Sequence, residues 1–250
     1  MILTIQGLAF YYPGRSILQD VNLQVQQGEC LAILGTNGVG KTTLLKCINR
    51  VLKPQQGVVL VENEAVFKLS RSELAKRIGY VSQRQETPRH NVFDAVLLGR
   101  RPYIKWDVSA RDLKIVEQVL GLLDLNDFSL RYLDELSGGE LQKVIIARAL
   151  AQEPDVLLFD EPTSSLDLKN QIEVLKIIQH IVKTKQIAAI VTMHDLNQAI
   201  RFADKFLFLK EGTVFSAGGL EIITSENVES VYSIPVSIEQ FGNHPVVLPL

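Results

Sequence analysis

Short apolar runs rich in β-branched side chains recur along the chain, at residues 3–10, 21–25, 30–34, 58–61, 78–81, 156–159, 188–193 and 206–209. Runs of this length and composition are typical of β-strands. Between several of them the apolar positions change to a helical spacing. The three sets are Leu44, Leu45, Ile48 and Val51; Leu113, Val116, Val119, Leu120 and Leu123; and Ile172, Leu175, Ile178 and Val182. Alternating strands and helices predict an α/β domain with a largely parallel sheet.

Two regions depart from this alternation. The first strands follow one another without helices, and Lys210-Glu211-Gly212 has the composition of a hairpin turn, so an antiparallel subdomain is expected beside the parallel core. Residues 85–150 are mainly helical and interrupt the strand series, which predicts a helical subdomain inserted into one domain spanning 1–250. From about Ser216 onward the pattern indicates no defined element.

Composition narrows the possible classes of function. Lys and Arg number 26 against 28 Asp and Glu, a net charge of −2, which does not favour nucleic acid as a partner. The two cysteines, Cys30 and Cys47, are flanked by apolar residues and are expected to be buried in a reducing compartment. We identify no signal peptide and no apolar run near the ~20 residues that span a bilayer. If the chain serves transport, another chain must form the pore.

The first candidate site is residues 35–42, GTNGVGKT, which fits G-x-x-x-x-G-K-[ST] between a predicted strand and a predicted helix. Glycines let several backbone N–H groups point at one anion, and the helix start adds partial positive charge. Lys41 can reach the β- and γ-phosphates, and the Thr42 hydroxyl can ligate Mg²⁺. A glycine-rich turn with a chance lysine is the alternative, which the flanking strand and helix disfavour.

A second candidate is the apolar run at 156–159, which ends in Asp160 and Glu161. A buried strand explains the apolar residues but not two adjacent acids at its end. Asp160 would hold Mg²⁺ through water, and Glu161 would position or polarise an attacking water. With the phosphate motif, the pair indicates hydrolysis of ATP or GTP. The absence of an N-K-x-D guanine-recognition motif favours ATP.

A third motif, residues 136–140 (LSGGE), leads into an apolar helical run and forms a second helix start with the character of an anion site. Here the chain resembles the ABC ATPases, whose signature is Leu-Ser-Gly-Gly-Gln, and it differs from that signature at Glu140. The resemblance implies that Ser137, Gly138 and Gly139 of one subunit cap the γ-phosphate held by the other. An ordinary capped helix is the alternative for the pentapeptide taken alone.

The resemblance covers nearly the whole chain, and it implies further roles. Tyr12 would stack on adenine, Gln83 would sense Mg²⁺ and the γ-phosphate, residues 164–167 would touch the other subunit, and His194 would contact the γ-phosphate. The implied catalytic set is Glu161, His194, Lys41 and Gln83. The implied ATP-binding set is Tyr12, Gly35, Asn37, Gly38, Gly40, Lys41, Thr42, Thr43, Ser137, Gly138 and Gly139. The implied Mg²⁺ set is Thr42, Gln83 and Asp160.

Residues 84–106 lie between Gln83 and the helical insertion, where the resemblance implies that the membrane subunit docks. Within this stretch, residues 91–103 resemble the corresponding part of importers of iron–siderophore, haem and cobalamin complexes. This likeness implies a type II importer in which a homodimer of cassettes binds a polytopic membrane permease, served by an extracytoplasmic substrate-binding protein. The cassettes would be peripheral, at the cytoplasmic face of the inner membrane. An amphipathic helix packed on its own domain would give the same pattern.

Other functions remain open at this stage. Related cassettes import oxyanions such as molybdate. Soluble ABC ATPases of repair or translation usually carry a coiled-coil insertion or two cassettes, and neither is visible in this sequence. Kinases and helicase motors share the phosphate motif but have no reason to carry residues 136–140 together with His194.

Overall fold

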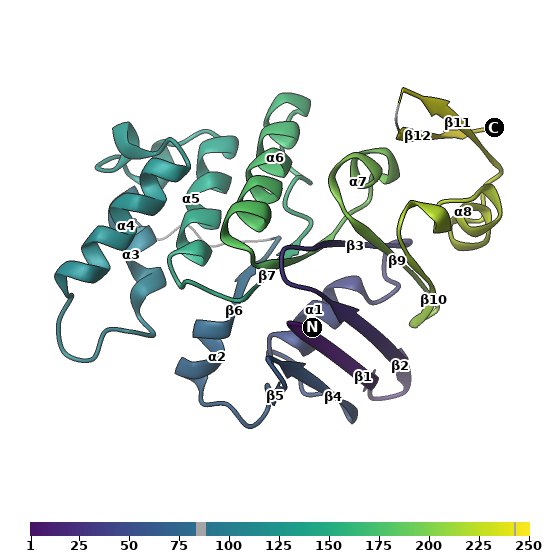
Figure 1. The fold of residues 1–250 in the computed structure, drawn as a ribbon, viewed down its shortest axis with the longest axis horizontal. Helices are drawn as coiled ribbons and strands as arrows, with labels where there is room; N and C mark the ends of the chain where they lie inside the picture. The colour runs from purple at the N-terminus through teal and green to yellow at the C-terminus, as the bar shows by residue number, and fades with distance from the viewer. Residues whose placement is uncertain (84–88, 243) are drawn as a thin grey trace.

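The computed structural model describes residues 1–83, 89–242 and 244–250. Figure 1 shows a central sheet, a second sheet at one side, a layer of helices at the opposite end from the C-terminal hairpin, and the chain start within the second sheet. The fold is the α/β arrangement expected from the sequence, with parallel and antiparallel parts. Residue ranges 84–88 and 243 lie outside the description.

The central sheet has the strand order β10-β9-β3-β8-β7-β6, in which only the β9–β10 pair is antiparallel. Its strands are β3 (Cys30–Leu34), β6 (Ile78–Val81), β7 (Val156–Asp160), β8 (Ala188–Thr192), β9 (Lys205–Lys210) and β10 (Thr213–Gly218). Every residue of β3, β7 and β8 is buried. Both faces of these strands are covered, which explains their continuous apolar runs.

The second sheet is antiparallel, with the order β2-β1-β4-β5. Its strands are β1 (Leu3–Tyr12), β2 (Arg15–Val25), β4 (Gln56–Val61) and β5 (Glu64–Ala65). Burial alternates along most of β2, as expected of a strand with one covered face. The packed face buries Leu18, Val21 and Val25 against the central sheet and the first helix.

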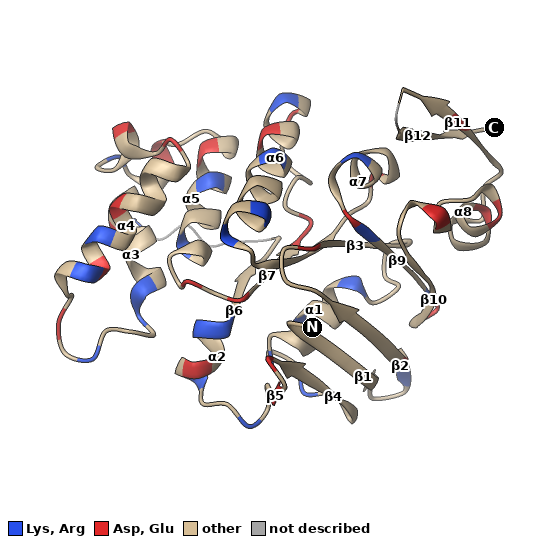
Figure 2. Cartoon of the chain, viewed as in Figure 1, with Lys and Arg blue, Asp and Glu red and all other residues tan. Residues whose placement is uncertain are grey.

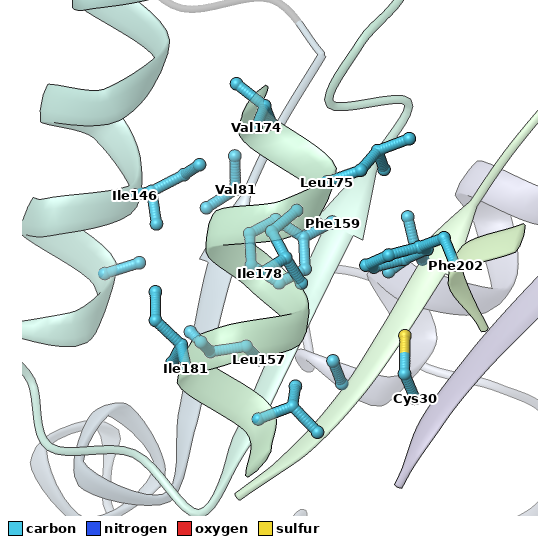
Figure 3. Close-up of a cluster of buried hydrophobic side chains, with 14 of the residues drawn as sticks. Cys30, Val81, Ile146, Leu157, Phe159, Val174, Leu175, Ile178, Ile181 and Phe202 are labelled. Atoms are coloured by element: carbon cyan, nitrogen blue, oxygen red, sulfur yellow. The ribbon is translucent and has the colours of Figure 1, made fainter. Parts of the chain in front are cut away.

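The helices are α1 (Lys41–Ile48), α2 (Arg71–Arg77), α3 (Val92–Leu97), α4 (Ala110–Leu122), α5 (Gly138–Leu150), α6 (Leu168–Lys185), α7 (Leu196–Phe202) and α8 (Ser225–Tyr232). Short 3₁₀ turns are η1 (Leu98–Arg100), η2 (Asn126–Phe128), η3 (Leu133–Glu135) and η4 (Leu220–Ile222). Figure 3 shows how α6 covers the sheet: Leu175, Ile178 and Ile181 lie over Leu157 and Phe159 of β7. This packing holds the carboxyl end of β7, where the two acids are placed.

Helices α3, α4 and α5 pack together at one end of the molecule, within the region predicted to be helical. Their link contains Arg100, whose side chain is 1% exposed. Its guanidinium donates to Asp112 at 3.0 Å and to Glu153 at 2.9 Å, so the buried cation is paired on two sides. Removing one partner of such a buried pair is strongly destabilising.

The C-terminal region, whose elements the sequence did not define, contains the edge strand β10, helix α8 and strands β11 and β12. A tight turn at Lys210-Glu211-Gly212 joins β9 to β10, confirming the predicted hairpin, with positive φ angles at Glu211 and Gly212. After α8, strands β11 (Val236–Phe241) and β12 (His244–Pro249) form a two-stranded sheet that packs on α7.

Three predicted core positions are wrong. Val51 is 59% exposed because α1 ends at Ile48 and the chain then turns through Arg50, whose φ of 55° is left-handed. Leu113 and Ile172 lie in the first two turns of α4 and α6 and are 39% and 43% exposed. The remaining predicted helical positions are buried or half-buried.

Both cysteines are free thiols buried in the core, as expected. Burial raises the pKa of the Cys30 thiol above its usual range and that of Cys47 to about 12. Neither thiol is therefore a nucleophile near neutral pH.

Candidate active site

The chain between β3 and α1 forms a tight loop that depends on glycine. Gly35 has φ 147° and Gly40 has φ 115°, both in the range that disfavours side chains. A Cβ at Gly35 would collide with the carbonyl oxygen of Leu209, and one at Gly40 would lie 2.9 Å from a methyl group of Leu18. Between them Asn37 and Gly38 are exposed, and Gly38 has φ 77°. The backbone thus forms a cradle that side chains would fill.

The start of α1 suits an anion. Its N-cap is Gly40, no side chain caps the first turn, and that turn contains no acidic residue. The N–H groups of a helix's first turn have no intrahelical partner and carry partial positive charge. Lys41, Thr42 and the half-buried Thr43 belong to this turn, so the predicted phosphate-binding residues are adjacent in space.

Lys41 is 5% exposed and points back over the loop. Its ammonium donates to the carbonyl oxygens of Gly35 at 2.7 Å and Thr36 at 3.1 Å. Burial lowers the pKa of Lys41, and the carboxylates of Glu161 and Asp160 oppose that shift. The ammonium therefore lies in a partly desolvated site, where its attraction for phosphate oxygens is stronger than in water.

Asp160, the last residue of β7, lies beside the first turn of α1. Its Oδ1 accepts hydrogen bonds from the hydroxyls of Thr42 at 2.9 Å and Thr192 at 3.0 Å, and its Oδ2 accepts one from Tyr80 at 3.4 Å. A hydroxyl and a carboxylate next to a phosphate cradle are the oxygen donors that Mg²⁺ prefers. These residues fit Mg²⁺, which would be held by Thr42 and Asp160.

Glu161 follows β7 with a left-handed φ of 51°. Its backbone N–H donates to the Thr192 hydroxyl at 2.9 Å. One carboxylate oxygen accepts from Nε2 of Gln83 at 2.6 Å, and the other contacts Nε2 of His194. Three predicted catalytic residues thus meet at one carboxylate, although they are separated by up to 111 positions in the chain.

Thr192 is a site residue that the sequence analysis missed. Its hydroxyl donates to Asp160 and accepts from the backbone of Glu161, so it fixes both acids from the neighbouring strand β8. Thr192 is completely buried. It is the one hydroxyl in the apolar run at 188–193, and that polar residue just before His194 is the signal that could have revealed it.

The helix start at Ser137 is built differently and lies elsewhere. Ser137 caps α5, and the Glu140 carboxylate accepts from both the N–H and the hydroxyl of Ser137, at 2.8 and 2.7 Å. Gly138 and Gly139 begin the helix, where a Cβ on Gly139 would lie 2.5 Å from the Asn170 side chain. Figure 1 shows α5 well separated from α1, so one chain does not bring this helix start to its own cradle.

Comparisons with known proteins agree with this geometry. The family model described as ABC transporter matches residues 18–164. The chain is 56% identical, over its full length and 98% of the relative, to an uncharacterized ABC transporter ATP-binding protein of Methanocaldococcus jannaschii. This chain belongs to the ABC transporter family. It also resembles YusV of Bacillus subtilis, a probable siderophore transport system ATP-binding protein, at 36% identity over 98% of the chain and 91% of that protein.

The fold agreement with a solved ABC transporter is equally broad. A metal-chelate type ABC transporter in an inward-facing conformation superposes with a TM-score of 0.86 at 32% identity, covering 100% of this chain and 97% of that one. The chain therefore has the fold of an ABC ATPase, binds ATP and hydrolyses it. The predicted enzyme class is confirmed.

Two elements predicted from the family likeness lie at the margin of the site. Tyr12, at the end of β1, is 46% exposed and packs edge-to-face on Phe10, with ring centroids 5.0 Å apart. The loop at 164–167 ends at Asp167, which caps α6 by accepting from the Asn170 N–H at 2.8 Å. Leu166 of this loop faces Gly138, so the loop lies beside the start of α5 in its own chain.

Proposed function

We propose that this ABC ATPase acts as a homodimer of cassettes that sandwiches two ATP molecules and powers a type II importer of a metal chelate, such as an iron–siderophore, haem or cobalamin complex. The observation that carries the hydrolytic part is the Glu161 carboxylate, held between Gln83 and His194 beside the Asp160–Thr42 pair. Each chain would act as one cassette over 1–250, with a helical subdomain at about 85–150.

The contacts support a proposed role for each group. Glu161 polarises or deprotonates the attacking water, and its two neighbours fix the orientation of the carboxylate. Lys41 and the backbone N–H groups of the cradle bind the β- and γ-phosphates and stabilise the charge that develops on them. Mg²⁺, held by Thr42 and Asp160 with Gln83 nearby, would neutralise phosphate charge. Tyr12 supports the adenine from the exposed end of β1.

The distance between the two helix starts supports the dimer. Figure 1 shows α1 and α5 lying apart in one chain, and both helices begin at glycine-rich motifs, with an uncapped first turn at α1 and a Ser137 cap at α5. A second copy of the chain, turned about a twofold axis, would place the signature of each copy over the cradle of the other. ATP would then be part of the interface, and hydrolysis would weaken it.

A separate membrane subunit is also part of the proposal. No helix in the described ranges is both long and apolar enough to cross a bilayer. Figure 2 shows Lys and Arg interspersed with Asp and Glu over the helices, which does not favour nucleic acid as the partner. We expect the cassette at the cytoplasmic face of the membrane, bound to a polytopic permease that receives cargo from an extracytoplasmic binding protein.

The expected docking stretch is partly described, since residues 84–88 lie outside the structure. Within it Leu97 is half-buried against the core of the helical layer, whereas Leu98 is 43% exposed and Trp106 is 99% exposed. Leu98 is therefore the better position to probe. Leu98→Arg should abolish recruitment to membranes containing the permease while leaving ATP binding intact, and unchanged recruitment would remove this stretch from the docking surface.

The cargo is inferred from likeness, because the cassette itself does not bind it. Support comes from the siderophore-transport relative and from the metal-chelate type structure. An oxyanion such as molybdate is the alternative cargo. Uptake of a labelled iron chelate by cells with and without the gene, compared with uptake of molybdate, distinguishes the two.

The dimer and the hydrolytic role are tested together with Glu161→Gln. The amide retains hydrogen bonding to the neighbours but removes the base, so Mg-ATP should remain bound and the dimer should accumulate in size-exclusion chromatography. The matched control is Glu173→Gln on α6, whose carboxylate pairs with Lys143 outside the site. It should hydrolyse ATP and return to monomer. A Glu161→Gln variant that stays monomeric with Mg-ATP contradicts the sandwich.

A further inference from the structure

The first glycine of the phosphate loop is bonded to the far end of the chain. The backbone N–H of Gly35 donates to the hydroxyl of Tyr232, the last residue of α8, at 3.1 Å. The Tyr232 side chain lies largely inside the protein, and burial raises its pKa to about 12, so the hydroxyl stays protonated at neutral pH. Gly35 itself is buried, and its N–H depends on a protein partner.

Gly35 links the Tyr232 hydroxyl to Lys41 through two hydrogen bonds. Its carbonyl oxygen accepts the ammonium of Lys41 at 2.7 Å, so one residue bonds Tyr232 through its N–H and Lys41 through its C=O. The φ of 147° and the carbonyl oxygen of Leu209, with which an added Cβ would collide, exclude a side chain at Gly35 that could anchor the loop. A shift of the Gly35 backbone would therefore move an acceptor of the lysine.

Helix α8 is well placed to supply a fixed hydroxyl. Val228 and Val231 are buried in the main core, which sets the rotation of the helix. The carboxylate of Glu229 accepts the backbone N–H of Val236 at 3.0 Å, which ties α8 to the first strand of the hairpin that follows. The hairpin and the helix are thus one bonded unit.

The hairpin is also hydrogen-bonded to α7, the helix that follows His194. The side-chain amide of Asn197 on α7 donates to the carbonyl of Val247 at 3.0 Å and accepts the Val247 N–H at 2.8 Å. Asp195, the residue after His194, is the N-cap of α7. The position of His194 is therefore linked to the same C-terminal unit as the position of Gly35.

We propose that α8 and the strands β11 and β12 form a C-terminal clamp, residues 225–242 and 244–249, that sets the phosphate cradle and His194 at a fixed spacing. In this clamp Tyr232 is a positioning residue for ATP binding, acting through Gly35 and Lys41. Asn197 is a positioning residue for hydrolysis, acting through α7 and His194. Figure 1 shows the clamp at the end of the molecule opposite the α3–α5 layer, away from the expected docking stretch.

The test separates binding from turnover in the full-length chain. Tyr232→Phe keeps the ring in the core and leaves the Gly35 N–H without its partner. We expect the Kd for Mg-ATP, measured by fluorescent-nucleotide displacement, and the KM for ATP to rise about five- to tenfold, with kcat within twofold of wild type. Asn197→Ala should give the converse, a kcat lowered about fivefold with an unchanged Kd.

The matched control is Asn227→Ala, which removes a hydrogen bond from the clamp to the preceding 3₁₀ turn, from the Asn227 amide to the carbonyl of Ile222 at 2.8 Å. It should lower the Tm without changing the Kd for Mg-ATP. If Asn227→Ala raises the Kd as much as Tyr232→Phe does, the effect is general loss of stability and the clamp is overturned. An unchanged Kd in Tyr232→Phe overturns it as well.

Discussion

Helices α1 and α5 both begin at glycine-rich motifs, but their first turns are chemically opposite. α1 starts at Gly40 with no side-chain cap and no acid, and Lys41 is folded over the loop. α5 starts at Ser137 with a complete capping box, in which the Glu140 carboxylate occupies the position an anion would take. The first start is open to a phosphate, whereas the capping box of the second already bonds the N–H groups of Ser137 and Glu140.

In the proposed dimer, these two different helix starts would serve one nucleotide. An uncapped start costs stability, since its N–H groups lack partners until an anion binds, and that cost is tolerated where binding occurs. A capped start is stable without a bound anion. We therefore expect changes at α1 to affect binding and hydrolysis most, and changes at α5 to affect stability and association.

The largest expected effect is that of Lys41→Met. Removing the buried cation should lower the rate of phosphate release at saturating Mg-ATP by about 100- to 1000-fold, because the charge that develops on the phosphate loses its closest stabilising group. Lys46→Met, on the last turn of the same helix, is the control and should retain the wild-type rate. Retention of more than a tenth of the activity in Lys41→Met would show that the cradle works without its lysine.

A smaller effect is expected from Ser137→Ala, which removes the cap of α5. The loss should cost about 1 kcal/mol and lower the Tm by roughly 2–4 °C. If the dimer uses this helix start, hydrolysis should also fall about tenfold. Ser109→Ala removes the same kind of capping box from α4, far from the cradle, and provides the comparison.

Calorimetry and phosphate release on both serine variants separate the two roles. Equal losses of Tm with loss of activity in Ser137→Ala alone would assign Ser137 to the nucleotide site. Equal activity in both variants would leave Ser137 with a structural role only and would count against the ATP sandwich.

The smallest effect is expected from Glu140→Gln, which keeps a capping side chain but removes a negative charge from the signature helix. The Mg-ATP-dependent dimer of the Glu161→Gln background should form about two- to fivefold more tightly, because less repulsion opposes the γ-phosphate. The gain should shrink as salt is added. Unchanged association at low salt would mean that Glu140 turns away from the phosphate in the dimer.

The stability difference between wild type and the same variant should depend on pH. Hydrogen bonds from Ser137 hold the pKa of Glu140 below its usual value. The ionised carboxylate therefore stabilises the folded protein at pH values above the pKa that Glu140 has in the unfolded chain. This stabilisation is lost as the pH falls through the pKa that Glu140 has in the folded protein. The Tm of wild type minus that of Glu140→Gln should therefore decrease between about pH 5 and pH 3. A constant difference would show that the cap does not depend on the charge.

Much of the site was predictable because its parts are local in sequence. The loop at 35–42 needs only consecutive residues, and strands β3, β7 and β8 were evident from their apolar runs. The family resemblance implied that the acids at the end of β7 and the histidine after β8 act on the bound phosphates, and the carboxyl ends of parallel strands meet at one edge of a sheet. The structure places Lys41, Glu161 and His194 together accordingly.

Other parts of the structure could not be predicted from a periodic pattern. Helix α1 ends early at a left-handed residue, so Val51 leaves the apolar face that spacing assigned to it. The segment from Ser216 onward alternates weakly, and the position of its β11–β12 pair depends on hydrogen bonds to α7. Thr192, Tyr80 and Tyr232 are isolated polar residues whose bonding partners lie far away in the chain.

The sequence alone therefore determined the family, the parallel core, the phosphate cradle and the acids that serve it, because consecutive residues and regular spacing encode these features directly. Only the tertiary structure decided which hydroxyls hold Asp160 and Glu161, that Gly35 is bonded to Tyr232, and that the signature helix start lies away from its own cradle. The physical reason is that a single long-range hydrogen bond leaves no period in the sequence, whereas a buried face or a phosphate loop does.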